Sequence, residues 1–468
     1  MGSSKILSVA AQIVLGWLLS VEDFAIYAIA ISASSFVSSV RNGGVQRLLV
    51  QKGADYDRLA FSMAKIGLMS NAGIFLLLIF LSPILEAHFN ADNLRYLIWI
   101  IAFSVLINTP AVIFRAKLSI DLRFASLSKV SVASAAVRYV SMIIFALLGL
   151  GAFSFVLPLV LVAIFEGAAY WRLAGSLRRS DVTTGSLFRE LWPDMRWVLI
   201  GAIAAVSVTQ GDYLVLGLMA DKRTLGFYFF AFQLVLSVSV LFSSAIETVL
   251  TPSFVKISDD PERQRRAFLK SVQSALLILP PVIVCGLLFI DPVVNNIWQG
   301  KWNDSIPVMQ LFLITMLTRL PMLSGLSLLE ARGYWKSRTL VTGADGIGVV
   351  VSIIIGAWAG GLLTVAMFSS IYRFVSAGVF LALCGRISGI PIREFGRSLQ
   401  PLLIVLAASV AVSLLSAWYF DIRTEKTIVA LTMCGIFTVL WVAACYIACR
   451  PQCAALASAI LPGKGIRK

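Results

Sequence analysis

Residues 130–171 read VSVASAAVRYVSMIIFALLGLGAFSFVLPLVLVAIFEGAAYW. This stretch contains two apolar runs, Val130–Leu150 and Ala152–Trp171, which are separated only by Gly151. Each run is close to the ~20 residues that an α-helix needs to cross the hydrocarbon core of a bilayer. Two runs of this length joined by a single glycine predict a hairpin of two transmembrane helices.

The rest of the chain has the same character. Of its 468 residues, 59% are hydrophobic and only 13% are charged, and the mean hydropathy is +0.89. A soluble domain is nearer half apolar and a quarter charged. We therefore predict an all-α integral membrane protein with about fourteen transmembrane helices. The predicted spans are Ile6–Leu19, Phe24–Val40, Phe61–Leu81, Leu94–Ile113, Val130–Leu150, Ala152–Trp171, Trp197–Met219, Leu225–Leu250, Ser271–Ile290, Ile306–Leu329, Leu340–Trp358, Leu362–Cys384, Pro401–Phe420 and Ile428–Cys449.

Basic residues alternate along the loops between these spans. One set of alternate loops carries most of the lysines and arginines, for example Arg115, Lys117 and Arg123, and the other set carries few. Basic residues accumulate in cytoplasmic loops, so the alternation predicts that both termini are cytoplasmic. The formal net charge of +15 is explained first by this topology and second by an anionic substrate.

The sequence contains an internal repeat. Residues 24–30 (FAIYAIA) match residues 225–231 (LGFYFFA), and Pro110 matches Pro321. Residues 122–124 match residues 333–335, and Gly151 matches Gly361. The offsets of about 200–210 residues predict two parallel six-helix lobes, an architecture of transporters. We place the N-terminal lobe at residues 1–180 and the C-terminal lobe at residues 190–390. Residues 391–468 form two additional C-terminal transmembrane helices and a short cytoplasmic tail.

Three arginines lie deep within predicted spans: Arg138, Arg319 and Arg373. A charge at this depth is costly unless it faces water or a partner. One explanation is interhelical ion pairing, for example of Arg138 or Arg373 with Asp345. The other is a cationic substrate cavity for an anionic head group, because a guanidinium binds phosphate oxygens and stays protonated. Three arginines divided between the two lobes favour the cavity.

Acidic residues within the spans are candidates for coupling to an ion or for ion pairing. These residues are Asp212, Asp345, Glu166 and Glu247.

Arg41 and Arg47 flank Asn42-Gly43-Gly44 at the inner end of the second predicted span. They indicate either a topology signal or a cytoplasmic gate, and the topology signal is the simpler interpretation.

Several classes of function are excluded. The chain has one histidine and neither an H-E-x-x-H nor a GxxxxGK[ST] motif, which excludes a zincin-type protease and a P-loop ATPase. The predicted loops are too short for a catalytic domain, since a folded domain needs ~50 residues or more. We therefore expect no catalytic residues, no metal, no cofactor and no nucleic-acid partner.

Several stretches resemble a known family. The stretch from Leu19 to Ala28 is similar to an opening written "LsPedfGlYal", although Ala25 replaces the usual glycine. Residues 211–217 (GDYLVLG) followed by 225–231 resemble the signature "D..llg....lG.Y..A", and Asp212 matches its aspartate. Residues 251–254 (TPSF), 300–302 (GKW) and 331–333 (ARG) fit later positions. Together these motifs resemble the polysaccharide (Wzx-type) flippase branch of the multidrug/oligosaccharidyl-lipid/polysaccharide exporter superfamily over about residues 5–390.

This resemblance implies a function. The cargo would be an undecaprenyl-diphosphate-linked oligosaccharide, moved across the bacterial inner membrane by alternating access for exopolysaccharide, capsule or O-antigen synthesis. Membrane lipids, a polysaccharide polymerase and chain-length proteins are the expected partners, and we expect the chain to act as a monomer. The two additional helices would shelter the lipid tail.

Two other functions stay open. A drug/cation antiporter of the same superfamily would need an acidic cavity, which the deep arginines disfavour. A membrane polysaccharide polymerase would carry a large outer loop, which the predicted spans do not leave room for.

Overall fold

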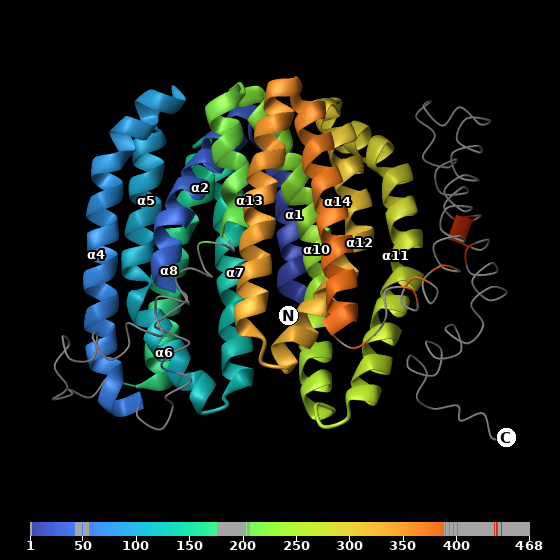
Figure 1. Cartoon of the computed structure of the whole chain (residues 1–468). Helices are drawn as coiled ribbons and strands as arrows, with labels where there is room; N and C mark the ends of the chain where they lie inside the picture. The colour runs from blue at the N-terminus through green and yellow to red at the C-terminus, as the bar shows by residue number, and fades with distance from the viewer. Residues whose placement is uncertain are drawn as a thin grey trace. The chain divides into compact units, whose positions relative to one another are not determined.

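The computed structural model describes residues 2–42, 56–175 and 206–387, together with single positions 49, 203, 389, 393, 396, 400, 435, 437, 438 and 441. Its elements are helical throughout, and the described residues contain no strand (Figure 1). The all-α prediction is therefore confirmed. The helices are α1 (Gly2–Leu18), α2 (Val21–Asn42), α4 (Tyr56–Phe89), α5 (Leu94–Ile107), α6 (Thr109–Ile120), α7 (Phe124–Leu147), α8 (Phe153–Ala174), α10 (Lys222–Lys256), α11 (Pro261–Trp298), α12 (Ile306–Ala331), α13 (Trp335–Ala359) and α14 (Leu362–Ile387), with a 3₁₀ turn η2 (Asn303–Ser305).

Eight helices among the described residues are long and apolar enough to cross a membrane, or nine if a bent pair counts as one span. The spans predicted between residues 24 and 384 coincide with helices wherever the structure describes them. Residues 206–219 are the described part of the seventh predicted span. The last two predicted spans lie outside the described residues, apart from positions 435, 437, 438 and 441.

Helix α11 is much longer than its apolar run. Helix α11 has 38 residues and begins with the polar segment PERQRRAFLK, where Pro261 occupies the first turn and Asp260 caps it by accepting from the Arg263 backbone N–H. A proline in the first turn costs no hydrogen bond, since the first N–H groups of a helix have no intrahelical partner. The apolar run thus marks the membrane crossing, and the cap marks where the helix begins.

The fourth predicted span is broken. The sequence predicted one helix over Leu94–Ile113, whereas α5 ends at Ile107 and α6 begins at Thr109, with a 41° bend between them. Pro110 lacks an N–H and its ring clashes with the preceding turn, so the helix restarts here. The buried Asn71 amide of α4 donates to the Thr109 hydroxyl at this break.

Contacts divide the chain into two compact units. Unit 1 comprises residues 1–237 and 342–365, and unit 2 comprises residues 238–341 and 366–468. The repeat-based lobes at 1–180 and 190–390 remain a prediction. Unit 1 extends past the first six predicted spans because the start of α10 packs on the start of α2: a Cβ at Gly226 would lie only 2.2 Å from the Val21 carbonyl oxygen.

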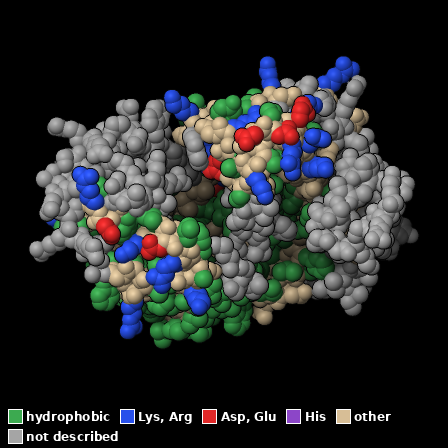
Figure 2. All heavy atoms as spheres, turned by 90° about the horizontal axis from the view of Figure 1, so that it is seen from below, with side chains coloured by type: hydrophobic (Ala, Val, Ile, Leu, Met, Phe, Trp, Pro, Cys, Tyr) green, Lys and Arg blue, Asp and Glu red, His purple; other side chains and the backbone are tan. Residues whose placement is uncertain are grey.

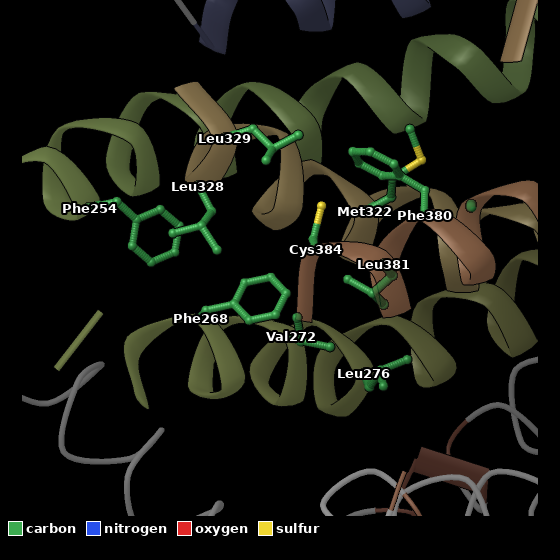
Figure 3. Close-up of a cluster of buried hydrophobic side chains, with 11 residues drawn as sticks. Phe254, Phe268, Val272, Leu276, Met322, Leu328, Leu329, Phe380, Leu381 and Cys384 are labelled. Atoms are coloured by element: carbon green, nitrogen blue, oxygen red, sulfur yellow. The ribbon is translucent and has the colours of Figure 1, made fainter. Parts of the chain in front are cut away.

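The core of unit 2 joins four helices. Figure 3 shows Phe254 of α10, Phe268 and Val272 of α11, Leu328 of α12 and Cys384 of α14 converging in one cluster. Gly325 of α12 permits close approach, since a Cβ there would lie 2.8 Å from the Cys384 sulfur. This contact holds α12 against α14, the two helices that carry Arg319 and Arg373.

Equivalent turns end the fourth and tenth predicted spans. Leu122 and Gly333 both have positive φ, at 54° and 71°. In each turn the next residue's N–H bonds back five residues, from Arg123 to the Leu118 carbonyl and from Tyr334 to the Leu329 carbonyl, both at 2.9 Å. The two segments matched in the sequence repeat therefore adopt the same helix-ending geometry.

An arginine at each of these turns fastens a neighbouring helix end. Arg123 donates to the carbonyl of Leu173 at the end of α8 (2.7 Å), and Arg332 donates to that of Ile387 at the end of α14 (2.9 Å). Lys and Arg side chains gather on the face seen from below in Figure 2, consistent with the basic loops predicted from the sequence.

Candidate functional site

Arg138 lies within unit 1, nine residues before the end of α7, which is about 14 Å along the helix. Its guanidinium lies beside the Tyr27 phenol of α2 and 5.8 Å from the centroid of the Tyr139 ring. The Nε atom is buried and has no hydrogen-bond partner among the described residues. No carboxylate of the described chain lies within ion-pair distance of Arg138. The alternative pairing of Arg373 with Asp345 stays a prediction.

Arg373 and Arg319 lie within unit 2. Arg373 of α14 is 4% exposed, and its Nε donates to the hydroxyl of Ser369 one turn away (3.2 Å). Arg319 of α12 is half-buried. Measured from the helix starts, Arg319 lies about 20 Å and Arg373 about 16 Å along parallel-running helices that pack together. The Gly325–Cys384 contact aligns these two helices, and from it Arg319 lies about 9 Å and Arg373 about 16 Å toward the helix starts. Unit 2 therefore places two arginines on adjoining helices at different heights.

Asp212 is fully buried in unit 1. Its Oδ1 accepts from the Tyr213 backbone N–H (3.1 Å), and its Oδ2 accepts from the Tyr228 hydroxyl of α10 (3.3 Å). The Tyr213 and Tyr228 rings meet edge to face with centroids 6.2 Å apart. The signature aspartate is thus held in an aromatic setting, where a charged carboxylate depends on these hydrogen bonds for its stability.

The other acidic candidates lie on three different helices. Asp345 is buried in α13, with 8% exposed. Glu166 of α8 accepts from the Asn108 amide (3.2 Å), and Asn108 is the residue at the break between α5 and α6. Glu166 therefore forms a hydrogen bond at the break between α5 and α6. Glu247 falls within α10, but its side chain lies outside the described residues.

The two gate candidates are largely outside the described structure. Arg41 belongs to the last turn of α2, and its side chain is among those not described. Arg47 lies outside the described residues.

Aromatic side chains join α2 to the first turns of α10 within unit 1. Phe24 meets Phe230 edge to face at 5.4 Å, and Tyr27 meets Phe229 at 5.7 Å. Tyr27 also stacks on Phe155 of α8 at 4.4 Å. These contacts fasten the predicted outer end of α2 to that of α10.

The contacts of Tyr27 with Arg138 and of Tyr228 with Asp212 were missed by the sequence prediction. The two tyrosines occupy equivalent positions in the repeat, residues 24–30 and 225–231. One lies beside the Arg138 cation, and the other donates to the Asp212 anion. The sequence did show that both repeat segments carry a tyrosine at the same position. It could not show which residue of a neighbouring helix each tyrosine contacts.

Comparison with known proteins assigns the family. Residues 14–307 match the family described as "Polysaccharide biosynthesis protein". The chain is 21% identical over 430 residues to the teichuronic acid biosynthesis protein TuaB of Bacillus subtilis (strain 168), covering 86% of this chain and 85% of TuaB. It is 28% identical over 130 residues to the lipopolysaccharide biosynthesis protein WzxC of Escherichia coli (strain K12), covering 27% of this chain and 26% of WzxC.

Solved structures share the fold. The lipid II flippase MurJ in an inward closed conformation aligns with a TM-score of 0.74 and 16% identity, covering 96% of this chain and 97% of MurJ. An inward-facing multidrug resistance MATE family transporter of the MOP superfamily aligns with a TM-score of 0.61 and 15% identity, covering 84% and 96%. The resemblance predicted from the sequence motifs is confirmed. The chain is a multi-pass membrane protein of the polysaccharide biosynthesis protein family, and it shares the fold of MurJ and of the MATE family transporter.

Proposed function

We propose that this chain is a flippase that moves an undecaprenyl-diphosphate-linked oligosaccharide repeat unit from the cytoplasmic to the outer face of the inner membrane. Its product would enter exopolysaccharide, capsule or O-antigen assembly. The family match and the names of TuaB and WzxC support a role in polysaccharide biosynthesis. The MOP-superfamily fold supports transport by alternating access.

The environment of Arg138 is the observation that best supports this proposal. A permanent cation is held at mid-depth of an apolar helix against phenol groups, and within the described chain no carboxylate neutralises it. Such a charge is costly unless it faces water or an anionic ligand. A diphosphate group or an acidic sugar satisfies this requirement, whereas a cationic drug would be repelled.

Arg319 and Arg373 would hold the same cargo from unit 2. The Nε atom of the Arg373 guanidinium donates to the Ser369 hydroxyl, and the group is planar and permanently charged. Planar guanidinium groups bind phosphate or carboxylate oxygens in pairs. Two of them on adjoining helices fit an elongated anion better than a single point charge.

Asp212 would couple the cycle to an ion gradient. A buried carboxylate that depends on hydrogen bonds favours one state when charged and another when protonated or bound to a cation. Asp345 is the second buried acid available for this role.

The packing of α2 on α10 would close the outer end. Phe24, Tyr27, Phe229 and Phe230 would have to separate before the cargo could leave outward. Arg41 and Arg47 are the corresponding candidates for the cytoplasmic gate.

A complementation assay tests the proposal. A strain lacking its own repeat-unit flippase would express the wild type or the single variants Arg138→Ala, Arg319→Ala and Arg373→Ala, with membrane levels of each protein measured. We expect wild type to restore surface polymer, and the variants to accumulate lipid-linked intermediate at normal protein level. If wild type fails in several sugar backgrounds but confers resistance to cationic drugs, the antiporter function replaces this one.

A further inference from the structure

Four buried polar atoms on three helices of unit 1 have no hydrogen-bond partner in the described structure. They are Gln12 Nε2 on α1, Ser34 Oγ on α2, and Ser134 Oγ and Arg138 Nε on α7. The described chain holds eight such side-chain atoms in all, so half of them fall on these three helices. Buried polar groups are normally satisfied, and an unsatisfied group in a native protein indicates a missing water, ion or ligand.

Ser134 and Arg138 share one face of α7. They are four residues apart, which places their side chains one above the other on the helix surface. Ser134 is 5% exposed, and its hydroxyl does not bond back to the preceding turn. Ser141 on the same helix behaves in the ordinary way, donating to the carbonyls of Val137 (2.5 Å) and Arg138 (3.0 Å). The unpaired hydroxyl of Ser134 is therefore not a general feature of serines on α7.

Two helices near α7 carry the other two unsatisfied groups. Helix α1, which carries Gln12, packs along α7. Helix α2 carries Tyr27, which lies beside Arg138, and Ser34 lies two turns further along the same face of α2. Ser34 is 1% exposed.

The chemistry of these groups selects the ligand. An amide N–H, a guanidinium N–H and two hydroxyls can all donate, and the guanidinium adds a permanent positive charge. A water molecule could satisfy the donors but would not neutralise the charge. An anion with several oxygens, a phosphate or a carboxylate, meets both requirements.

We propose that Arg138, Ser134, Gln12 and Ser34 form an anion-binding site inside unit 1 that holds either the phosphate groups or a sugar carboxylate of the cargo. This inference rests on the proposed function and deepens it. Arg138 supplies the charge, and the three neutral groups determine the orientation of the anion. The Ser134 hydroxyl gives the site a specificity that a single buried arginine would not have.

Binding to the purified full-length protein in nanodiscs tests the site. The unfolding temperature would be measured against rising concentrations of inorganic diphosphate, of D-glucuronate and of D-glucose, at constant ionic strength. We expect one of the two anions to raise the unfolding temperature of wild type, and glucose to have no effect. A response to diphosphate assigns the site to the phosphates, and a response to glucuronate assigns it to an acidic sugar.

Two matched serine variants supply the control. Ser134→Ala should weaken anion binding about 10-fold or more, which corresponds to one lost hydrogen bond to a charged group. It should leave the unliganded protein as stable as wild type or more stable. Ser141→Ala removes a satisfied hydroxyl and should bind the anion as wild type does. Arg138→Gln should abolish the response.

Three results would overturn the site: no stabilisation of wild type by either anion, equal anion binding by Ser134→Ala and Ser141→Ala, or a loss of unliganded stability in Ser134→Ala. The complementation assay separates this inference from the proposed function. If wild type restores polymer while the two serine variants bind alike, the function stands and the site fails. If the anion binds as expected but no polymer is restored, the site stands and the flippase function fails.

Discussion

Gly226 is the residue at which α10 comes closest to the start of α2. A Cβ there would lie 2.2 Å from the Val21 carbonyl oxygen and 2.6 Å from the Val21 side chain. Since a backbone atom cannot move aside as a side chain can, Gly226→Ala should destabilise the protein by about 1–3 kcal/mol. Thermal unfolding in detergent checks this, with Gly73→Ala as the control, because Gly73 lies in a helix with open space around its Cβ position. A Gly226→Ala variant as stable as Gly73→Ala would contradict the close packing.

Tyr228 donates one of the hydrogen bonds that stabilise Asp212. Tyr228→Phe keeps the ring contacts but removes this donor from a fully buried carboxylate. The expected loss of stability is about 1–3 kcal/mol, since the carboxylate cannot turn to water instead. Tyr170→Phe is the matched control, because Tyr170 is 2% exposed and its hydroxyl makes no hydrogen bond in the described structure. Equal unfolding temperatures of the two variants would show that the Tyr228 hydroxyl does not support Asp212.

The sequence predicted the depth of Arg138, Arg319 and Arg373 because depth follows from position along an apolar run. It could not predict their neighbours. Ser369 is four residues before Arg373, so helical spacing could have predicted their contact. Tyr27 contacts Arg138 from another helix, and helical spacing does not predict such a contact. Arg138 makes no ion pair within the described chain, and tertiary packing, not sequence spacing, decides which charges meet.

At the scale of helices, Asp221 caps the start of α10. Its carboxylate accepts from the Thr224 backbone N–H (3.2 Å). Burial alone would raise the pKa of Asp221, but hydrogen bonds from Thr224 and from the Arg223 backbone outweigh burial and hold the pKa below its usual range. A carboxylate with a depressed pKa stabilises the fold above its unfolded-state pKa, and this contribution is lost as the pH falls through the folded-state pKa.

Asp221→Asn should therefore flatten the acid limb of the stability profile. Asparagine also caps a helix but does not titrate. Unfolding temperatures measured between about pH 5 and pH 2 should fall less steeply for the variant than for wild type. Parallel profiles would show that Asp221 contributes no pH dependence to folding.

The sequence predicted which segments form helices, but it did not predict where each helix begins and ends. Apolar runs located every described span, because lipid selects for length and hydrophobicity. The break at Asn108 was missed although Pro110 had been noticed as part of the repeat, since proline is tolerated in many membrane helices when neighbouring side chains satisfy the backbone. The Asn71, Thr109 and Glu166 contacts that accompany the break come from separate helices.

At the scale of the whole molecule, the proposed transport cycle would require the packing of α2 on α10 to open. A bifunctional thiol crosslinker applied to Phe24→Cys with Phe230→Cys should block transport, and reduction should restore it. The control pair is Phe24→Cys with Phe155→Cys, which shares one position and has a similar ring separation of 5.0 Å against 5.4 Å. This second pair lies wholly within the first six predicted spans, so its crosslink should leave transport active. Equal inhibition by both crosslinks would mean that α2 and α10 do not separate.

A flippase moves a lipid-linked oligosaccharide across a bilayer without other proteins, and this can be measured on the purified chain. The chain would be purified and reconstituted into vesicles that contain an undecaprenyl-diphosphate-linked oligosaccharide with a labelled sugar. The label on the outer leaflet would be followed with an enzyme that cannot cross the membrane. We expect labelled lipid initially on the inner leaflet to become accessible to this enzyme faster than in protein-free vesicles, and Arg138→Ala to remove the acceleration. Accessibility that never exceeds that of protein-free vesicles, with correctly folded protein present, would contradict the proposed flippase function.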